Sequence, residues 1–230
     1  MKELLPWTKL PNGWIEDRGL RGFRWADGQG ADDLAALMTM TAVANRADPA
    51  TGIARMTYDG LCGATGLSRA KVSAGLKVLV ERGLVERGPE GRGTYRLGGY
   101  DPASGWAQFP ARGLYRNGAI AAFADFHLRR PAELEALKLY FLFASRRDRA
   151  TNWALLTYDK IEEYSGVPRN NIRRALAVLG ANSLVYVDNI ESTKSATGVA
   201  NAYRLVHLNT RLHMGMLGRR VGVLEDLEAP

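Results

Sequence analysis

The 230-residue sequence is poor in cysteine and histidine and has no long apolar run. Cys62 is its one cysteine, and there are three histidines. A single cysteine excludes an internal disulfide and any metal site built from several cysteines. No apolar stretch approaches the roughly 20 residues that a membrane-spanning helix needs, and the first residues lack the apolar core of a secretory signal peptide. We therefore expect a cytoplasmic protein without a membrane partner.

Residues with catalytic or metal-binding chemistry are not grouped in the sequence. The histidines lie far apart and lack the carboxylate or cysteine spacing of a metal site. Glu162 and Glu163 are adjacent, so on a helix they point in different directions. The glycine-rich segment 88–93 lacks the Gly-Lys-Ser/Thr of a phosphate-binding loop and is typical of a hairpin turn. We expect no enzyme activity, no metal and no cofactor.

Positive charge exceeds negative charge. The sequence has 31 lysines and arginines against 24 acidic residues, a formal net charge of +7. Such an excess favours a polyanionic partner, above all nucleic acid, through long-range attraction and counterion release. Many basic proteins bind nothing acidic, so the position of the charge matters more than its sum.

The most informative feature is an internal similarity with a period of 100 residues. Residues 34–85 align with residues 134–185 without a gap, and 19 of the 52 positions are identical. Further on, Tyr95-Arg-Leu97 matches Tyr203-Arg-Leu205 once eight extra residues are allowed in the second copy. We interpret this as an internal duplication. It predicts one domain over residues 1–100, a second over 101–210 and a C-terminal tail over 211–230.

Both copies predict the same order of elements. A first helix is expected near residues 32–45 and 132–145, from apolar residues spaced as a buried stripe. Thr57 and Thr157 suit the start of a short second helix. Gly66 and Gly166 suit the left-handed turn that ends it.

A third helix follows in each copy, and after it a two-stranded hairpin. The third helices carry apolar residues at the spacing of one buried face: Val72, Leu76 and Leu79 in the first copy, Ile172, Leu176 and Leu179 in the second. Strands are predicted at 83–87 and 94–97, and at 183–187 and 202–205, with turn-rich segments between them. The expected class is mainly α with small β-hairpins (α+β).

The first copy resembles the winged helix-turn-helix domains of bacterial regulators. The resemblance rests on Thr57-Tyr-Asp-Gly-Leu61, Thr65-Gly-Leu-Ser-Arg69, the apolar stripe that follows, and Gly83-Leu-Val85. The second copy departs from this pattern at Pro168 and Ser183 but keeps its spacing. Two such domains in one chain resemble plasmid and phage replication initiators and some transcriptional regulators. The resemblance implies two tandem winged helix-turn-helix domains that bind double-stranded DNA.

The third helices would then be the recognition helices of the major groove. Segments 68–77 and 168–177 each carry a charge of +3 and no acidic residue. Arginine can bond guanine and asparagine can bond adenine, each with two hydrogen bonds. The candidate DNA-binding residues, wing tips included, are Arg69, Ala70, Lys71, Ser73, Lys77 and Arg92 in the first copy, and Arg169, Asn170, Asn171, Arg173, Arg174 and Lys194 in the second.

The two recognition helices differ, which predicts an asymmetric site of about 20 base pairs in two successive major grooves. Three functions stay open: a transcriptional regulator, a plasmid or phage replication initiator that binds origin repeats, and a protein-interaction scaffold that binds no DNA. The C-terminal tail is a candidate for self-association. The tryptophans are expected to be packing residues that mostly seat the segment before each first helix: Trp7, Trp14, Trp25, Trp106 and Trp153.

Overall fold

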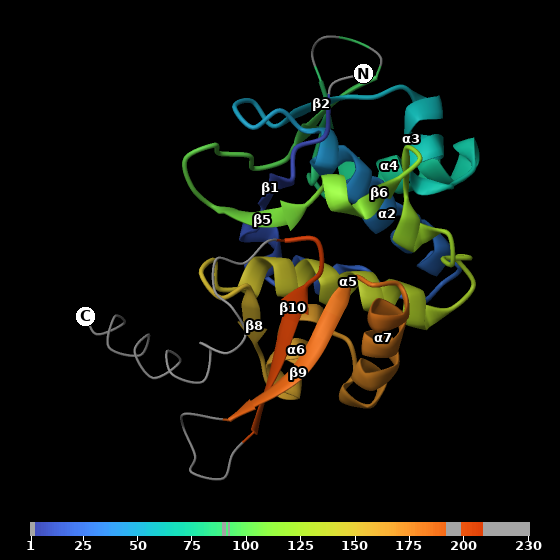
Figure 1. Cartoon of the computed structure of the whole chain (residues 1–230). Helices are drawn as coiled ribbons and strands as arrows, with labels where there is room; N and C mark the ends of the chain where they lie inside the picture. Colours follow the sequence, from blue (N-terminus) through green and yellow to red (C-terminus); the bar gives the residue numbers. More distant parts are fainter. Residues whose placement is uncertain (1–2, 89–90, 92, 192–198, 209–230) are drawn as a thin grey trace.

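The computed structural model describes residues 3–88, 91, 93–191 and 199–208, and within them the chain is an α+β fold (Figure 1). Two groups of elements with the same order follow one another, which we call unit 1 (residues 30–97) and unit 2 (residues 131–205). Unit 1 consists of α2 (Gly30–Arg46), β2 (Ile53–Arg55), α3 (Tyr58–Thr65), α4 (Arg69–Glu81), β3 (Val85–Arg87) and β4 (Thr94–Leu97). Unit 2 consists of α5 (Pro131–Arg146), β8 (Trp153–Leu155), α6 (Tyr158–Ser165), α7 (Arg169–Ala181), β9 (Val185–Glu191) and β10 (Val199–Leu205).

Each unit has a small antiparallel sheet, in the order β2-β4-β3 in unit 1 and β8-β10-β9 in unit 2. The two predicted hairpins are therefore confirmed. The hairpin of unit 2 is longer than that of unit 1, because β9 and β10 have seven residues each, against three in β3 and four in β4. The third strand of each sheet was not expected. It pairs with the return strand on the side away from the hairpin partner.

The predicted start and end of the short second helix, α3 in unit 1 and α6 in unit 2, are confirmed. Thr57 Oγ1 accepts a hydrogen bond from the Gly60 amide at 3.0 Å, and Thr157 does the same for Lys160 at 3.3 Å. These bonds satisfy amides that the first turn of a helix leaves unpaired. Gly66 and Gly166 have φ of 73° and 68°, the left-handed conformation that ends the helix.

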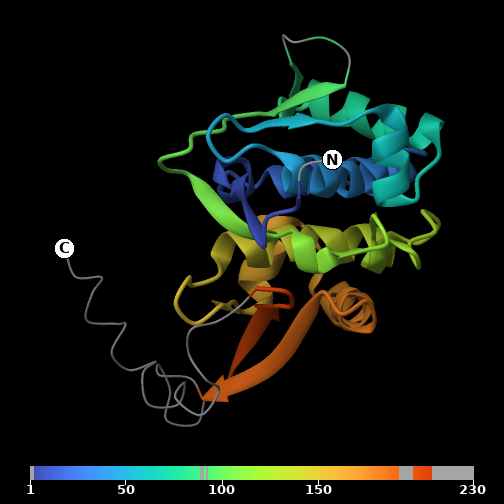
Figure 2. The same ribbon diagram turned by 45° about the horizontal axis from the view of Figure 1, so that its top comes forward.

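The first helices α2 and α5 are buried on almost all sides, not along one stripe. Helix α2 packs against α4 on one side and against α5 on the other, and α5 packs against α7. Most residues along both helices are apolar or small, which suits a helix with neighbours on several sides. Figure 2 shows the result, with α2 and α5 as the two middle layers and the sheets of the two units at opposite ends.

Two further segments precede the units. The first lead-in (residues 7–22) holds β1 (Trp7–Pro11), the helical turn α1 (Gly13–Glu16) and the 3₁₀ turn η1 (Gly19–Gly22). The second lead-in (residues 106–123) holds β5 (Trp106–Pro110), η2 (Arg112–Leu114), β6 (Tyr115–Arg116), β7 (Ala119–Ile120) and η3 (Ala121–Phe123). Strands β6 and β7 form a two-stranded hairpin.

Strands β1 and β5 pair antiparallel, and their register is symmetric: the first residue of each strand lies opposite the last residue of the other. Trp7 lies opposite Pro110 and Pro11 lies opposite Trp106, with Lys9 opposite Gln108 at the centre. The two strands also share one burial pattern along their five residues. The segment just after the predicted boundary at residue 100 thus contains a strand that pairs with a strand near the start of the chain.

Each lead-in crosses to the other unit. Turn η1 of the first lead-in contacts α6 of unit 2, and β7 of the second contacts α3 of unit 1. The buried apolar residues of both units form one continuous core. Within the described residues, none of the helices combines the length and apolar character that crossing a bilayer needs.

Candidate nucleic-acid interface

Helices α4 and α7 bury the predicted apolar faces. Val72 and Leu79 are fully buried on α4, as are Ile172 and Leu179 on α7. These residues face the first helix of their own unit, so the opposite face of each helix is left to solvent. Of the candidate DNA-binding residues that the structure describes, all are exposed except Lys71 and Asn171, which are half-buried.

The cations of α4 have acidic neighbours on other turns and other helices. Arg69 pairs with Asp59 of α3 at 3.0 Å, and Lys71 pairs with Asp32 of α2 at 2.7 Å. Lys77 lies 3.8 Å from Glu81, one turn further along α4. The segment 68–77 is free of acids, but the folded surface around it is not.

On α7, too, two of the three arginines have an acidic partner on another helix, and Arg173 is the exception. Arg169 forms an ion pair with Asp159 of α6. Arg174 and Asn171 both bond the carboxylate of Glu135 on α5, at 3.1 and 2.6 Å. Arg173 is exposed and has no hydrogen bond or ion pair with any residue of the described part of the chain.

The hydrogen-bond and ion-pair partners divide these candidate DNA-binding residues into two groups. The side chains of Lys71, Asn171 and Arg174 turn toward the first helix of their unit, where they fasten the third helix to it. Arg69 and Arg169 instead pair with carboxylates of the preceding short helix, and each is more than three-fifths exposed. Ion pairs of such exposed groups contribute little to stability, so a phosphate or a base can replace the carboxylate at small cost.

On unit 2 the exposed groups of α7 meet in one open hollow. It has a volume of about 650 Å³, and Arg169, Asn170 and Arg173 line it together with Tyr158 and Glu162 of α6. The Arg169 guanidinium lies 5.9 Å from the centre of the Tyr158 ring. Two guanidinium groups and a carboxamide at one surface are donors of the kind that base edges and phosphates accept.

The hairpins carry less of the predicted site than the helices. Arg87 and Arg96 are exposed on the unit 1 hairpin. Arg92 and Lys194, predicted at the two wing tips, lie outside the described residues, as does the tail after residue 208. In unit 2, Arg204 lies over the rings of Trp153 and Tyr186, at 5.3 Å from each ring centre.

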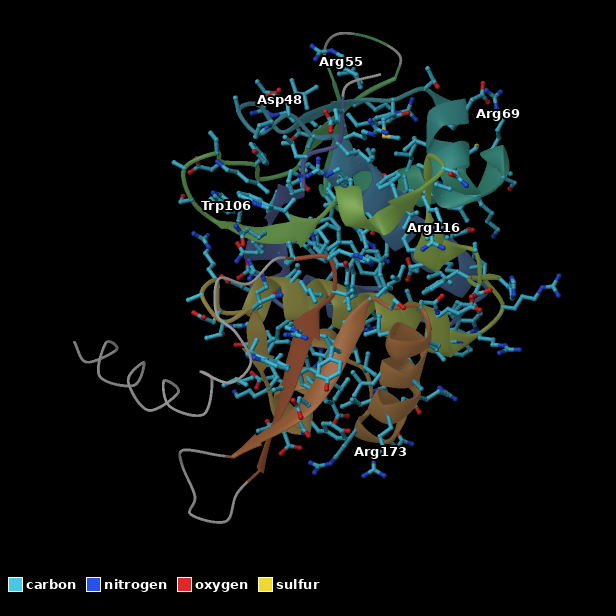
Figure 3. All side chains as sticks on the ribbon, in the orientation of Figure 1. Asp48, Arg55, Arg69, Trp106, Arg116 and Arg173 are labelled. Atoms are coloured by element: carbon cyan, nitrogen blue, oxygen red, sulfur yellow. The ribbon has the colours of Figure 1, made fainter. Side chains whose placement is uncertain are left out.

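The two surfaces lie far apart. Helix α4 is on the outer side of α2 and α7 is on the outer side of α5 (Figure 2). Figure 3 accordingly shows Arg69 and Arg173 at opposite ends of the molecule. Their separation is a consequence of the contact between α2 and α5, which no sequence pattern within either copy indicates.

Other residues singled out in the sequence have packing roles or stand alone. Trp7 and Trp106 stack at 5.9 Å between ring centres, and Trp14 packs against Phe23 and Phe141. Cys62 is half-buried on α3. Among the described residues, no three histidine, cysteine or acidic side chains come together in a way that could hold a metal ion.

In comparisons with known proteins, no protein-family model and no curated protein matches this chain.

Proposed function

We propose that the chain is a sequence-specific double-stranded DNA-binding protein that acts as a transcriptional regulator. The proposal treats each unit as a winged helix-turn-helix domain and the pair as the product of an internal duplication. It is supported by the shared order of elements, by the left-handed glycine between the second and third helices of each unit, and by the matching sheets.

The observation that carries the proposal is the outward face of α7. Arg169, Asn170 and Arg173 are brought together there, and Arg173 has no partner among the described residues. Arginine and asparagine have the donor and acceptor pattern to read guanine and adenine in the major groove. We assign base contacts to these three residues and, on α4, to Arg69 with close approach at Ala70 and Ser73. Lys77 suits a phosphate contact.

Lys71, Asn171 and Arg174 have a smaller part in this proposal than the sequence suggests. Each is bonded to a carboxylate of the first helix of its unit. We assign them the positioning of α4 and α7 on α2 and α5.

The separation of the two helices bears on the form of the DNA site. Arg69 and Arg173 lie toward opposite ends of the molecule in the view of Figure 3. If one duplex contacts both helices by bending between them, the bend costs a few kcal/mol in a way that depends on sequence. Because the two helices carry different side chains, we expect two unlike half-sites.

The test is selection of a random duplex library by the full chain at about 150 mM salt, where non-specific binding is weak. The expected result is enrichment of a motif with two unlike half-sites. An R169A/R173A double variant should lose the half-site that unit 2 reads and retain the other. An R112A variant removes an exposed arginine on the second lead-in, and it should select the wild-type motif.

If the chain retained DNA but no motif were enriched, its function would be non-specific coating of DNA. No salt-sensitive retention at all would overturn the proposal and favour a protein-interaction scaffold.

Replication initiation on a plasmid or phage is the second candidate. It is favoured by two unlike recognition helices in one chain, which suit an asymmetric repeated site. The selected motif separates the two functions: an initiator's sites recur in an origin, and a regulator's sites lie at promoters.

A further inference from the structure

A pocket of about 500 Å³ is lined by residues 21–25, by the first half of α5 and by the start of α7. Each of these three parts contributes a cation to the lining, and the four cations are Arg21, Arg24, Lys138 and Arg174. We call it the basic pocket. Its volume is within the range of small-molecule sites in proteins, about 300–1,000 Å³.

Lys138 is the buried cation of the basic pocket. This residue is only 5% exposed, and its ammonium group donates a hydrogen bond to the backbone carbonyl oxygen of Phe23 at 2.8 Å. A carbonyl oxygen carries no net charge, so the bond uses one of the three ammonium protons without neutralising the group. A buried charge without an opposite charge is costly, and an anion in the pocket removes that cost.

Arg21 and Arg24 are the exposed cations that the segment 21–25 brings to the pocket. Arg21 donates a hydrogen bond to the backbone carbonyl oxygen of Glu163 at 3.0 Å, and Nε of Arg24 donates one to that of Arg21 at 3.3 Å. Neither guanidinium group pairs with a carboxylate among the residues that the structure describes. These bonds orient the two groups and leave their charges without a counterpart.

The carboxylates near the pocket have other cationic partners. Glu135, the acidic residue of the lining, bonds Arg174 at 3.1 Å. The buried Asp33 pairs with Arg82 at 2.8 Å, and its other carboxylate oxygen accepts a backbone amide. The other three cations of the basic pocket are therefore left without a bonded carboxylate in the described part of the chain.

Unit 1 lacks these charges at the aligned positions. Met38 stands where α5 has Lys138, and Ala74 stands where α7 has Arg174. The basic pocket is thus particular to unit 2.

We propose that the basic pocket binds the phosphate group of a small phosphorylated molecule. A phosphate monoester carries close to two negative charges at neutral pH and three strong acceptor oxygens, which matches three uncompensated cations better than a carboxylate does. Arg21 and Arg24 bond its oxygens through their planar N–H groups, and Lys138 meets it from the buried side.

A backbone phosphate of DNA fits this pocket less well than a terminal phosphate does. It is a diester with a single charge, and a sugar on either side keeps it from being enclosed. The buried position of Lys138 therefore favours a small molecule as the source of the phosphate.

The experiment is isothermal titration of the full chain, without DNA, with inorganic phosphate as probe at constant ionic strength. Dimethyl phosphate copies the diester of DNA, and acetate copies a carboxylate. We expect one phosphate to bind per chain, with each comparator at least about tenfold weaker. No saturable binding of phosphate below about 10 mM would overturn the proposal, and equal binding of dimethyl phosphate would overturn the choice of a small molecule.

Variants locate the bound phosphate. K138M copies unit 1 at the buried position, and R21A/R24A removes the two exposed guanidinium groups. Each should weaken binding at least about tenfold, and K138M decides the matter if the double variant does not fold. R112A removes an exposed arginine of the second lead-in and should leave the titration unchanged. Wild-type affinity in either pocket variant that folds would overturn the proposal. Because no DNA is present, no outcome depends on the proposed function.

Discussion

The ammonium group of Lys138 on α5 donates a hydrogen bond to the backbone carbonyl oxygen of Phe23 at 2.8 Å, across 115 residues of sequence. Phe23 follows the first lead-in, so the bond fastens the start of the chain to unit 2. The lysine is buried, and loss of solvation lowers its pKa from 10.5 to about 8. The carboxylates of Glu135 and Asp33 oppose this effect, and Arg21 and Arg24 add to it.

The lowered pKa predicts how stability depends on alkaline pH. Between pH 8 and 10.5 the unfolded chain holds a proton on Lys138 that the folded chain releases, so the free energy of unfolding rises with pH in this window. The pKa difference corresponds to at most about 3 kcal/mol. Urea unfolding of wild type and K138M between pH 7.5 and 9 measures this contribution, because tyrosines with the ordinary pKa of 10 are still largely protonated there.

The wild-type free energy should rise more steeply with pH than that of K138M. Parallel profiles for the two proteins would show that burial does not perturb this lysine.

Gly75 sets the distance between α4 and α2. A Cβ at this position would lie 2.8 Å from the carbonyl carbon and oxygen of Ala35 on α2, closer than real contacts allow. G75A should therefore lower the free energy of unfolding by about 1–3 kcal/mol, because two backbones must separate. Thermal or urea unfolding gives the value.

Gly180 on α7 is the matched control, since an added Cβ there meets nothing within 4 Å. G180A should be neutral or stabilise by up to about 1 kcal/mol, as expected for glycine replaced in a helix. Equal effects of the two substitutions would contradict the close approach at Gly75.

Arg173 and Lys77 should affect DNA binding in different ways. If Arg173 reads a base, R173A costs about 1–3 kcal/mol on the selected site and much less on a site already altered at that base pair. If Lys77 contacts phosphate, K77A weakens all sequences alike and lowers the slope of log affinity against log salt by about one. Competition binding over a panel of single-base variants of the site distinguishes them. A uniform loss in both variants would refute the assignment of Arg173 to a base.

Glu163 predicts a stability change in acid. Hydrogen bonds from Lys160 and Arg18 hold the pKa of this carboxyl at about 2, against an ordinary value of 4.5. The depressed pKa stabilises the fold above pH 4.5, and this contribution disappears as pH falls toward 2. E163Q should remove that part of the acid dependence in a pH series of thermal unfolding.

E162Q serves as the control for this series, because the Glu162 side chain has no ion pair among the described residues. An acid profile of E163Q that superimposes on those of wild type and E162Q would contradict the role of the Arg18 contact between the first lead-in and unit 2.

The helices and hairpins could be predicted because their signals are local. Threonine at a helix start, glycine after a helix and apolar residues spaced by three and four each act within one turn. The third strands β2 and β8 were missed because three residues are too few for an alternating pattern, and their pairing partners lie some 40–50 residues away.

The candidate site could be predicted only in part, because a local sequence signal does not show which distant residues pair with a helix. The sequence indicates which residues of α4 and α7 face outward, but Asp32 and Glu135, which bind Lys71 and Arg174, come from helices nearly 40 residues earlier.

The ladder between β1 and β5 joins the two halves of one chain, and this has a consequence at low concentration. Proteins that read two half-sites commonly do so as separate subunits, and their occupancy of DNA falls as dilution dissociates them. Because α4 and α7 belong to one polypeptide, their ratio is one to one at any concentration, and the ladder adds a contact between the halves that dilution does not dissociate. If both helices read DNA as proposed, each is free to acquire a specificity of its own without losing the other at low copy number.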